Sequence, residues 1–327
     1  MPLIESCFIP PRLLAGGHSQ TLWPVLFRPR IVPQYVRQRL ELPDGDFIDL
    51  DWTLAAGPGE ARSGKMALVI HGLEGHAHRK YVLGMAQALR AAGWDICALN
   101  HRGCSGEPNR LPRTYHSGET DDVHTALESA IAQGPYAQAA LVGFSMGGNQ
   151  VAKYLGEDPG RVPGELCGAV AVSAPLDLEA SVTVLERGAS RLYQAYLMRS
   201  LKEKIRAKHT MHPSQLPLDC LPTMRTFREF DDTYTAPLHG FADASDYYAR
   251  CSGGRTLDAV AVPLLVLNAA DDPFLGPECF PQEIAQQNPA LFLEMPSHGG
   301  HVGFVPRRGW PSWPEVRAVE FLGGCAL

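Results

Sequence analysis

The stretch that decides the fold is Ala139-Ala140-Leu141-Val142-Gly143-Phe144-Ser145-Met146-Gly147-Gly148, an apolar run that continues through a Gly-x-Ser-x-Gly pattern into a helical segment. A serine at a tight turn between a strand and a helix has a strained backbone, and the flanking glycines relieve close contacts with neighbouring chain. Such a turn raises the hydroxyl above the sheet, near the positive end of a helix. We therefore predict that Ser145 is a nucleophile; an ordinary glycine-rich loop is the alternative.

Apolar runs followed by helical periods occur on both sides of this motif. The runs lie at 66–70, 95–99, 139–144 and 167–172, and helical periods follow the first three at about 80–92, 119–133 and 147–156. Runs that are apolar on both faces and alternate with amphipathic helices are typical of parallel strands covered by helices. A hairpin precedes them, with strands at 36–42 and 47–54 around the turn Pro43-Asp44-Gly45-Asp46. The sequence predicts an α/β fold with a mostly parallel central sheet flanked by helices.

The alternation of strands and helices stops after Pro175 and resumes at Val262. Residues 176–261 show helical periods without a convincing strand, and strands at 262–267 and 291–295 and a helical stretch at about 314–322 follow. We expect a core formed by residues 1–175 and 262–327, with residues 176–261 as a helical cap insertion.

Composition excludes several classes of protein. The 327 residues carry 29 Lys and Arg against 35 Asp and Glu, a net charge of −6, which gives no overall attraction to nucleic acid phosphates. The eight cysteines form no CxxC pair, so we predict free thiols. The N-terminal stretch lacks the apolar region of a secretory signal, and the apolar runs are far shorter than the roughly 18 residues of a membrane span. We expect a cytoplasmic protein without a nucleic acid partner.

A serine nucleophile needs a base, and the base needs an acid to orient it. In this architecture the acid follows a later strand and the histidine lies in the last loop. Asp271 and Asp272 follow the run at 262–267, and His298 and His301 follow the run at 291–295. We predict Asp272 as the acid, because a residue before proline is held extended. We predict His301 as the base, because two glycines free its loop; Asp271 and His298 are the alternatives.

The stretch His71-Gly72-Leu73-Glu74-Gly75 ends the first parallel strand, where this architecture supplies an oxyanion donor. We predict the backbone amides of Leu73 and Met146 as the two donors; a simple glycine turn is the alternative for the first. The pair His76 and His78 lacks further ligands at metal spacing, so we predict no metal site.

The stretch His116-Ser117-Gly118-Glu119-Thr120-Asp121 matches an HxxxxD pattern sometimes associated with acyl transfer. Ser117, Thr120 and Asp121 are also residue types that begin helices. We favour the start of a helix, and acyl transfer is the alternative.

These motifs resemble the α/β-hydrolase superfamily and, within it, the YheT-like branch of esterases, which includes lipid esterases and alcohol acyltransferases. The segments that carry the resemblance are 17–21, 42–46, 71–75, 102–109, 115–120, 230–248, 271–274 and 298–304. The resemblance implies Ser145 as nucleophile, Asp272 as acid and His301 as base, in agreement with the choice made from the residues. Chemistry by such a triad requires no metal or organic cofactor. We therefore predict a serine carboxylesterase, and the apolar lining implied by the cap favours short- to medium-chain acyl or lipid esters as substrates. An acyltransferase and a non-catalytic ligand-binding protein are the alternatives.

A basic segment lies within the expected cap. Between Arg187 and Lys208 there are seven Lys or Arg residues against one acid, and an apolar residue recurs every four positions, at Tyr193, Leu197, Leu201 and Ile205. Two interpretations are open: peripheral contact with an anionic membrane surface, or a cap helix with its apolar side on the active site and its charged side in water. We favour the second. The sequence leaves the oligomeric state open.

Overall fold

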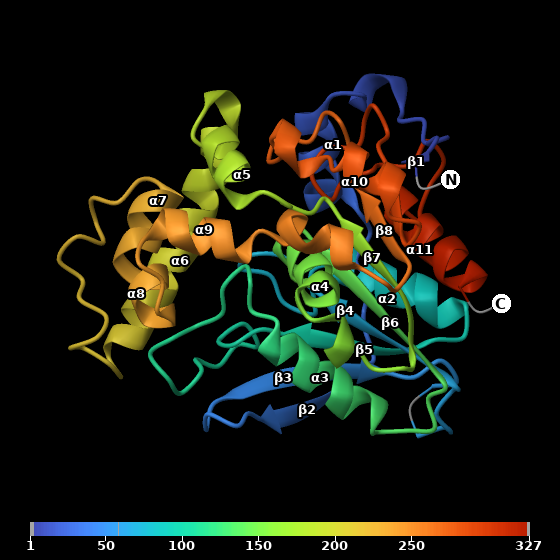
Figure 1. The fold of residues 1–327 in the computed structure, drawn as a ribbon, viewed down its shortest axis with the longest axis horizontal. Coiled ribbons are helices and arrows are strands. Elements are labelled where there is room, and N and C mark those ends of the chain that lie inside the picture. Colours follow the sequence, from blue (N-terminus) through green and yellow to red (C-terminus); the bar gives the residue numbers. More distant parts are fainter. Residues whose placement is uncertain (1–2, 58, 326–327) are drawn as a thin grey trace.

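The hairpin and the apolar runs pair into a nine-stranded sheet, in the order β1-β9-β8-β7-β6-β4-β5-β3-β2 (Figure 1). The computed structural model describes residues 3–57 and 59–325. The strands are β1 (Leu3–Ile4), β2 (Val36–Glu41), β3 (Phe47–Thr53), β4 (Lys65–Ile70), β5 (Asp95–Asn100), β6 (Gln138–Phe144), β7 (Leu166–Val172), β8 (Leu264–Leu267) and β9 (Leu291–Glu294). Across the sheet, pairing is parallel from β1 to β5, and β3 pairs antiparallel with β5 and β2. The predicted α/β fold and its hairpin are confirmed.

Helices cover both faces of this sheet. They are α2 (Lys80–Ala91), α3 (Asp121–Ile131), α4 (Met146–Glu157), α10 (Gln282–Gln287) and α11 (Trp313–Gly324). Side chains alternate along β4, so that Leu68 packs with the core of α3, α4 and α10, while Val69 packs with that of α2 and α11. Both faces of the central strands are therefore buried, which is why these strands appear in the sequence as uninterrupted apolar runs.

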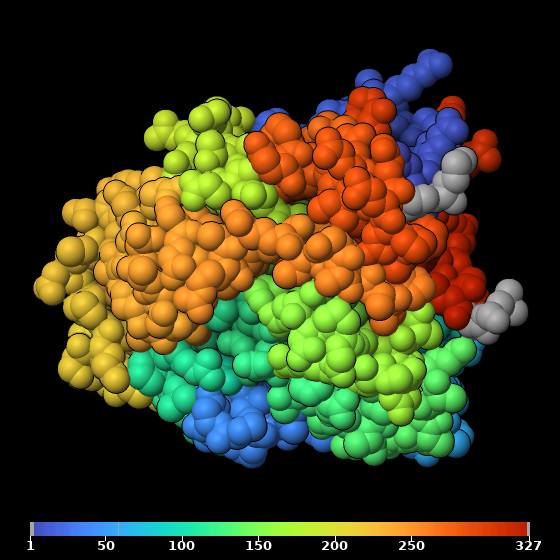
Figure 2. Space-filling view, in the orientation of Figure 1, coloured from blue at the N-terminus to red at the C-terminus, as the bar shows by residue number. Residues whose placement is uncertain are grey.

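Residues 176–261 hold helices, and the nine strands described above lie outside this range. The helices are α5 (Leu178–Leu185), α6 (Arg191–His209), α7 (Phe227–Phe230), α8 (Ala236–His239) and α9 (Ala244–Cys251). Met198, Tyr234 and Tyr248 belong to a separate apolar cluster that these helices form among themselves. Figures 1 and 2 show the segment gathered at one side of the sheet.

The N-terminal segment contains two elements that the sequence pattern did not predict. Strand β1 pairs with β9 through only two residues, Leu3 and Ile4. Helix α1 (Gly17–Phe27) contains Pro24 and has no side-chain cap at Gly16. Both usual signals of a helix, a capping side chain and the absence of internal proline, are thus missing.

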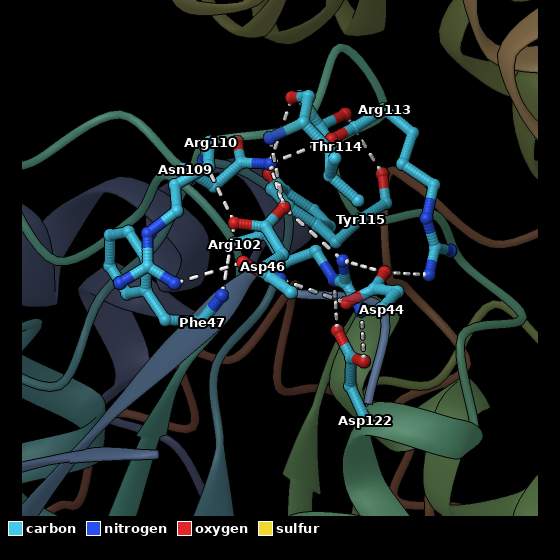
Figure 3. Close-up of polar contacts among 12 residues, drawn as sticks. Asp44, Asp46, Phe47, Arg102, Asn109, Arg110, Arg113, Thr114, Tyr115 and Asp122 are labelled. Carbon is cyan, nitrogen blue, oxygen red and sulfur yellow. Dashed lines mark hydrogen bonds and ion pairs between the residues drawn. The ribbon is translucent and has the colours of Figure 1, made fainter. Parts of the chain in front are cut away.

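A buried ionic network joins the hairpin turn to the loop after β5 (Figure 3). Arg102, whose side chain is 2% exposed, donates to Asp122 at the start of α3 (2.7 Å twice), to Asp44 (2.6 Å) and to Asp46 (3.2 Å). Burial by itself would raise the pKa of Asp44, but hydrogen bonds from Arg102 and Arg113 outweigh it and lower the pKa to about 2. The network therefore fixes the loop after β5 in place. The chain that follows contributes residues 114–117 to the wall of the cavity described below.

Candidate active site

Ser145 lies at the turn between β6 and α4, in the strained backbone conformation expected of it. Its φ is +53° and its ψ is −122°. A Cβ added at Gly143 would overlap the carbonyl oxygen of Gly147, and one added at Gly147 would lie 2.6 Å from the carbonyl oxygen of Ile70. Both glycines are therefore required by the close approach of neighbouring backbone.

The structure brings Ser145, His301 and Asp272 together. His301 Nε2 lies 2.8 Å from Ser145 Oγ, and His301 Nδ1 lies 2.9 and 3.1 Å from the two carboxylate oxygens of Asp272. The side chain of Asp272 is fully buried and that of His301 is 10% exposed. When Nδ1–H donates to the carboxylate, Nε2 is free to accept the serine hydroxyl proton. These hydrogen bonds, from Asp272 through His301 to Ser145, can activate the serine hydroxyl.

The alternative aspartate and histidine pair with each other instead. Asp271 accepts a hydrogen bond from the amide of Gly300 (2.9 Å), and its other oxygen lies 3.4 Å from Nδ1 of His298, which is 47% exposed. Neither residue lines the cavity into which Ser145 opens. Asp271 and His298 thus hold the two loops together.

Helix α1 supports the histidine loop, a role that the sequence analysis missed. The amide of His301 donates to Thr21 Oγ1 (2.9 Å). A Cβ added at Gly300 would overlap the carbonyl oxygen of Gly17, and one added at Gly17 would overlap that of Asp271. The segment 17–21 could have indicated this role, because it is one of the segments that carry the family resemblance. Its residues Gly17 and Thr21 contact the loop of His301.

An aromatic stack fixes the imidazole ring. Phe274 lies parallel to the ring of His301, with centroids 3.8 Å apart and planes 9° apart. Tyr193 of α6 packs on Phe274 at 4.9 Å, and its hydroxyl lies 3.0 Å from Nδ1 of His18. Helices α1 and α6 therefore meet beside His301. The sequence analysis had not assigned a role to Phe274, the residue that stacks on its ring.

Ser145 and His301 open into a cavity whose empty volume, together with its solvent-filled mouth, is about 980 Å³. Most of its wall is apolar, with side chains from α5, α6 and α7: Leu178, Val182, Leu185, Leu197, Leu201, Ile205, Phe227 and Phe230. A charged pair interrupts this wall, because Lys204 Nζ lies 2.7 Å from a carboxylate oxygen of Glu74. The Tyr115 hydroxyl donates to the same carboxylate (2.6 Å). The cavity suits an apolar chain attached to a polar reacting group.

Leu73 and Met146 both line this cavity beside Ser145. Within residues 3–57 and 59–325, neither backbone amide has a hydrogen-bond acceptor. Met146 is the first residue of α4, where amides have no partner inside the helix. A Cβ added at Gly72 would lie 2.9 Å from Ser145 Cβ, so the loop that carries Leu73 packs directly against the serine. Two free amides near the hydroxyl can stabilise a developing oxyanion.

The HxxxxD pattern does not assemble into a site. The side chain of Asp121 is 82% exposed and pairs with Arg161 (2.7 Å), whereas that of His116 is 11% exposed. Asp121 is the first residue of α3, as the favoured interpretation requires. Thr120 makes no side-chain cap, however, because its hydroxyl donates to Glu157.

His116 belongs instead to a cluster with Glu119 and His239, in which one potential ligand atom of each lies within 4.8 Å of the others. Nδ1 of His116 accepts a hydrogen bond from the amide of Gly118 (3.1 Å), which places the proton of the neutral ring on Nε2, facing Glu119 at 3.6 Å. Burial lowers the pKa of His239 to about 4, and it also lowers the pKa of His116 well below its usual value. With Nε2 protonated, His116 presents no lone pair to an ion in this arrangement.

The favoured interpretation of the basic segment holds for its apolar side, since Leu197, Leu201 and Ile205 line the cavity, but part of the expected solvated face of α6 is buried. Arg199 is exposed, but the side chain of Lys204 is 15% exposed and Lys208 is 1% exposed. Lys208 Nζ donates to Asn109 Oδ1 (2.7 Å), and burial lowers the pKa of Lys208 to about 8. Two of the cations therefore hold α6 to the loop after β5 and to Glu74, because acceptors from those segments face them.

Comparison with known proteins agrees with the fold. The family described as alpha/beta hydrolase fold matches residues 68–307. The Escherichia coli (strain K12) protein named "Putative esterase YheT" is 42% identical over 300 residues, which cover 91% of this chain and 87% of that protein. The Mus musculus protein named Phospholipase ABHD3 is 30% identical over 308 residues, which cover 93% of this chain and 74% of that protein.

The solved structure of the Pyrococcus furiosus esterase Pf2001 has the same fold. It matches with a TM-score of 0.57 at 16% identity, covering 98% of each chain. None of the helices described within residues 3–57 and 59–325 combines the length and the apolar composition of a membrane-spanning helix. The eight cysteines are free thiols, as the sequence predicts.

Proposed function

Because this chain belongs to the alpha/beta hydrolase fold family, we propose that it is a serine ester hydrolase that forms an acyl-enzyme on Ser145. Similarity to esterase- and phospholipase-named relatives supports hydrolase chemistry. The observation that supports a serine nucleophile is the chain of hydrogen bonds from Ser145 through His301 to the buried carboxylate of Asp272.

The reaction proceeds in two halves. His301 takes the hydroxyl proton as Ser145 Oγ attacks the ester carbonyl carbon, and the amides of Leu73 and Met146 hold the oxyanion. Asp272 keeps the imidazole oriented and stabilises it when charged. His301 then protonates the leaving alcohol, and the C–O bond of the ester breaks. Water, deprotonated by His301, attacks the acyl carbon, and the acid leaves as Ser145 regains its proton.

The cavity argues for an ester with an apolar acyl chain. Side chains of α5, α6 and α7 form most of the wall, and the polar groups gather near Glu74 and Lys204. We infer that the acyl chain lies against the helices, with short- to medium-chain acyl or lipid esters as the substrate class. The phospholipase-named relative makes lipid esters the first series to examine.

The test compares wild type with Ser145→Ala on nitrophenyl esters from acetate to palmitate. Ser181→Ala is the matched control, because this serine lines the same cavity but contacts the Cys279 thiol instead of the histidine. We expect hydrolysis to fall by at least about 10⁴-fold in Ser145→Ala and to change little in Ser181→Ala. A fluorophosphonate probe should label wild type and Ser181→Ala only. Hydrolysis or labelling that persists in Ser145→Ala would refute the proposal.

Addition of an alcohol to the same assay separates hydrolysis from acyl transfer. We expect free acid to remain the main product. A new ester formed at the expense of free acid would assign the acyl-enzyme to a transferase instead.

A further inference from the structure

Helix α1 presents Gln20 and Thr21 to the protein and most of its large apolar side chains to solvent, the reverse of an ordinary surface helix. Gln20 is fully buried, donating to the carbonyl of Leu14 (2.5 Å) and accepting from the amide of Val305 (2.6 Å). Just after the helix, the buried Arg28 pairs with Glu315 of α11 (2.6 Å). Polar contacts therefore fasten α1, and its apolar side chains are not needed for that attachment.

These outward side chains form an apolar face on α1, defined by Leu22, Trp23, Val25, Leu26 and Phe27, which are 38–68% exposed. Nine of the thirteen exposed large apolar side chains in the part of the chain that the structure describes lie between residues 9 and 36. Contiguous apolar surface of this kind marks an interaction site in soluble proteins.

Charge indicates what the apolar face of α1 contacts. Between Ser6 and Leu40 there is no Asp or Glu, although the whole chain carries a net charge of −6. Arg12 and Arg30 are exposed before and after α1. An apolar helix face with a tryptophan, flanked by cations and free of carboxylates, fits the boundary between headgroups and acyl chains of an anionic lipid bilayer.

The same helix touches the catalytic loops. Its first turn contacts Asp271 and Gly300, and Thr21 accepts from the amide of His301. Figure 1 shows α1 at the upper margin of the molecule, on the same side as α5, which contributes to the cavity wall. A surface bound by α1 thus lies next to the segments that form the site.

We propose that the apolar face of α1 docks this protein on an anionic lipid surface. The docking is a binding property of its own, whereas its use in presenting lipid esters to Ser145 rests on the proposed function. It differs from a contact through the basic segment of α6, in which Lys204 and Lys208 are engaged within the protein.

The test is flotation of the full chain with phosphatidylcholine vesicles that contain 30% phosphatidylglycerol or none. We expect wild type to float with the anionic vesicles. The variant Val25→Ser/Leu26→Ser/Phe27→Ser should lose at least about tenfold in partition coefficient. Met211→Ser, which removes an exposed apolar side chain elsewhere, should behave as wild type. Wild type that stays in the aqueous fraction, or a triple variant that floats equally well, would overturn the proposal.

A second variant tests the charge argument without touching the apolar face. Arg12→Gln/Arg30→Gln should weaken binding to anionic vesicles by roughly tenfold, and added salt should reduce the difference. An unchanged double variant would contradict an electrostatic contribution. A stable dimer that the triple variant abolishes, without vesicle binding by wild type, would show that the face binds a second copy.

Failure of this inference is distinguishable from failure of the proposed function. Ser145→Ala should float as wild type does, and the triple variant should hydrolyse soluble nitrophenyl acetate at the wild-type rate while losing activity on vesicle-bound ester. If Ser145→Ala remains hydrolytic but floats, the proposed function fails and the docking stands.

Discussion

Replacement of Arg102 by Met tests the buried ionic network that holds the loop after β5. Asp122, 4% exposed in its side chain, would lose both of its 2.7 Å hydrogen bonds from Arg102. Asp46 would lose one longer bond but keep the amide of Asn109 (2.6 Å) as a donor. Asp44 would keep Arg113. The change therefore leaves two buried carboxylates without their cation, of which Asp46 keeps neutral donors and Asp122 loses both donors; stranding Asp122 costs about 3–5 kcal/mol.

Urea unfolding, followed by circular dichroism, measures this loss of free energy of unfolding. Arg199→Met is the matched control, because Arg199 and Glu203 form an exposed pair, with side chains 80% and 58% exposed, worth at most about 1 kcal/mol. The double variant Arg102→Met/Asp122→Asn should regain part of the loss, since no charge is then stranded at residue 122. If Arg102→Met is no more destabilising than Arg199→Met, the network does not act as we argue.

The network also predicts how acid acts on stability. The pKa of Asp44 in the folded protein, about 2, lies below that of an unfolded aspartate, so its contribution is present above about pH 4 and is lost as pH falls towards 2. Because Arg102 supplies part of this shift, the stability difference between wild type and Arg102→Met should shrink between pH 4 and pH 2. A difference that stays constant over this range would contradict the assignment.

Three further substitutions test the site. Asp272→Asn should lower kcat by about 10⁴-fold and Asp271→Asn by less than about tenfold, measured on a nitrophenyl ester; similar losses in both would reject the assignment of the acid. Phe274→Ala should lower kcat by roughly tenfold with a smaller change in KM, and Phe274→Tyr should restore it; a loss confined to KM would mean that the ring only contacts substrate. Gly147→Ala should destabilise the protein by about 3 kcal/mol, whereas Gly323→Ala, which meets open space in α11, should not; equal melting temperatures would show that the turn tolerates a Cβ.

Apolar periodicity was sufficient to locate the central strands, because each is buried on both faces and few other structures produce such runs. The order of the later loops was sufficient to locate the candidate acids and bases, and Pro273 and the two glycines before His301 favoured Asp272 over Asp271 and His301 over His298. The distances support both choices. These features are local in sequence, which is why single-chain reasoning reached them.

Features that depend on distant partners could not be read in this way. Lys204 and Lys208 look like solvated cations until their acceptors, 130 and 99 residues away, are in place. The stacking of Phe274 on His301 depends on how two loops approach each other. Helix α1 escaped detection because Pro24 lies within it and because its outward face is apolar, so its pattern is not that of a helix packed on a core.

The contact between Thr21 and His301 joins residues 280 positions apart, and β1 pairs with β9 over a similar separation. During synthesis Thr21 emerges 280 residues before His301. Closure of so long a loop is slow compared with the pairing of adjacent strands. The support of His301 is therefore a late event of folding, and a nascent chain forms the turn at Ser145 well before it completes the loop of the proposed base.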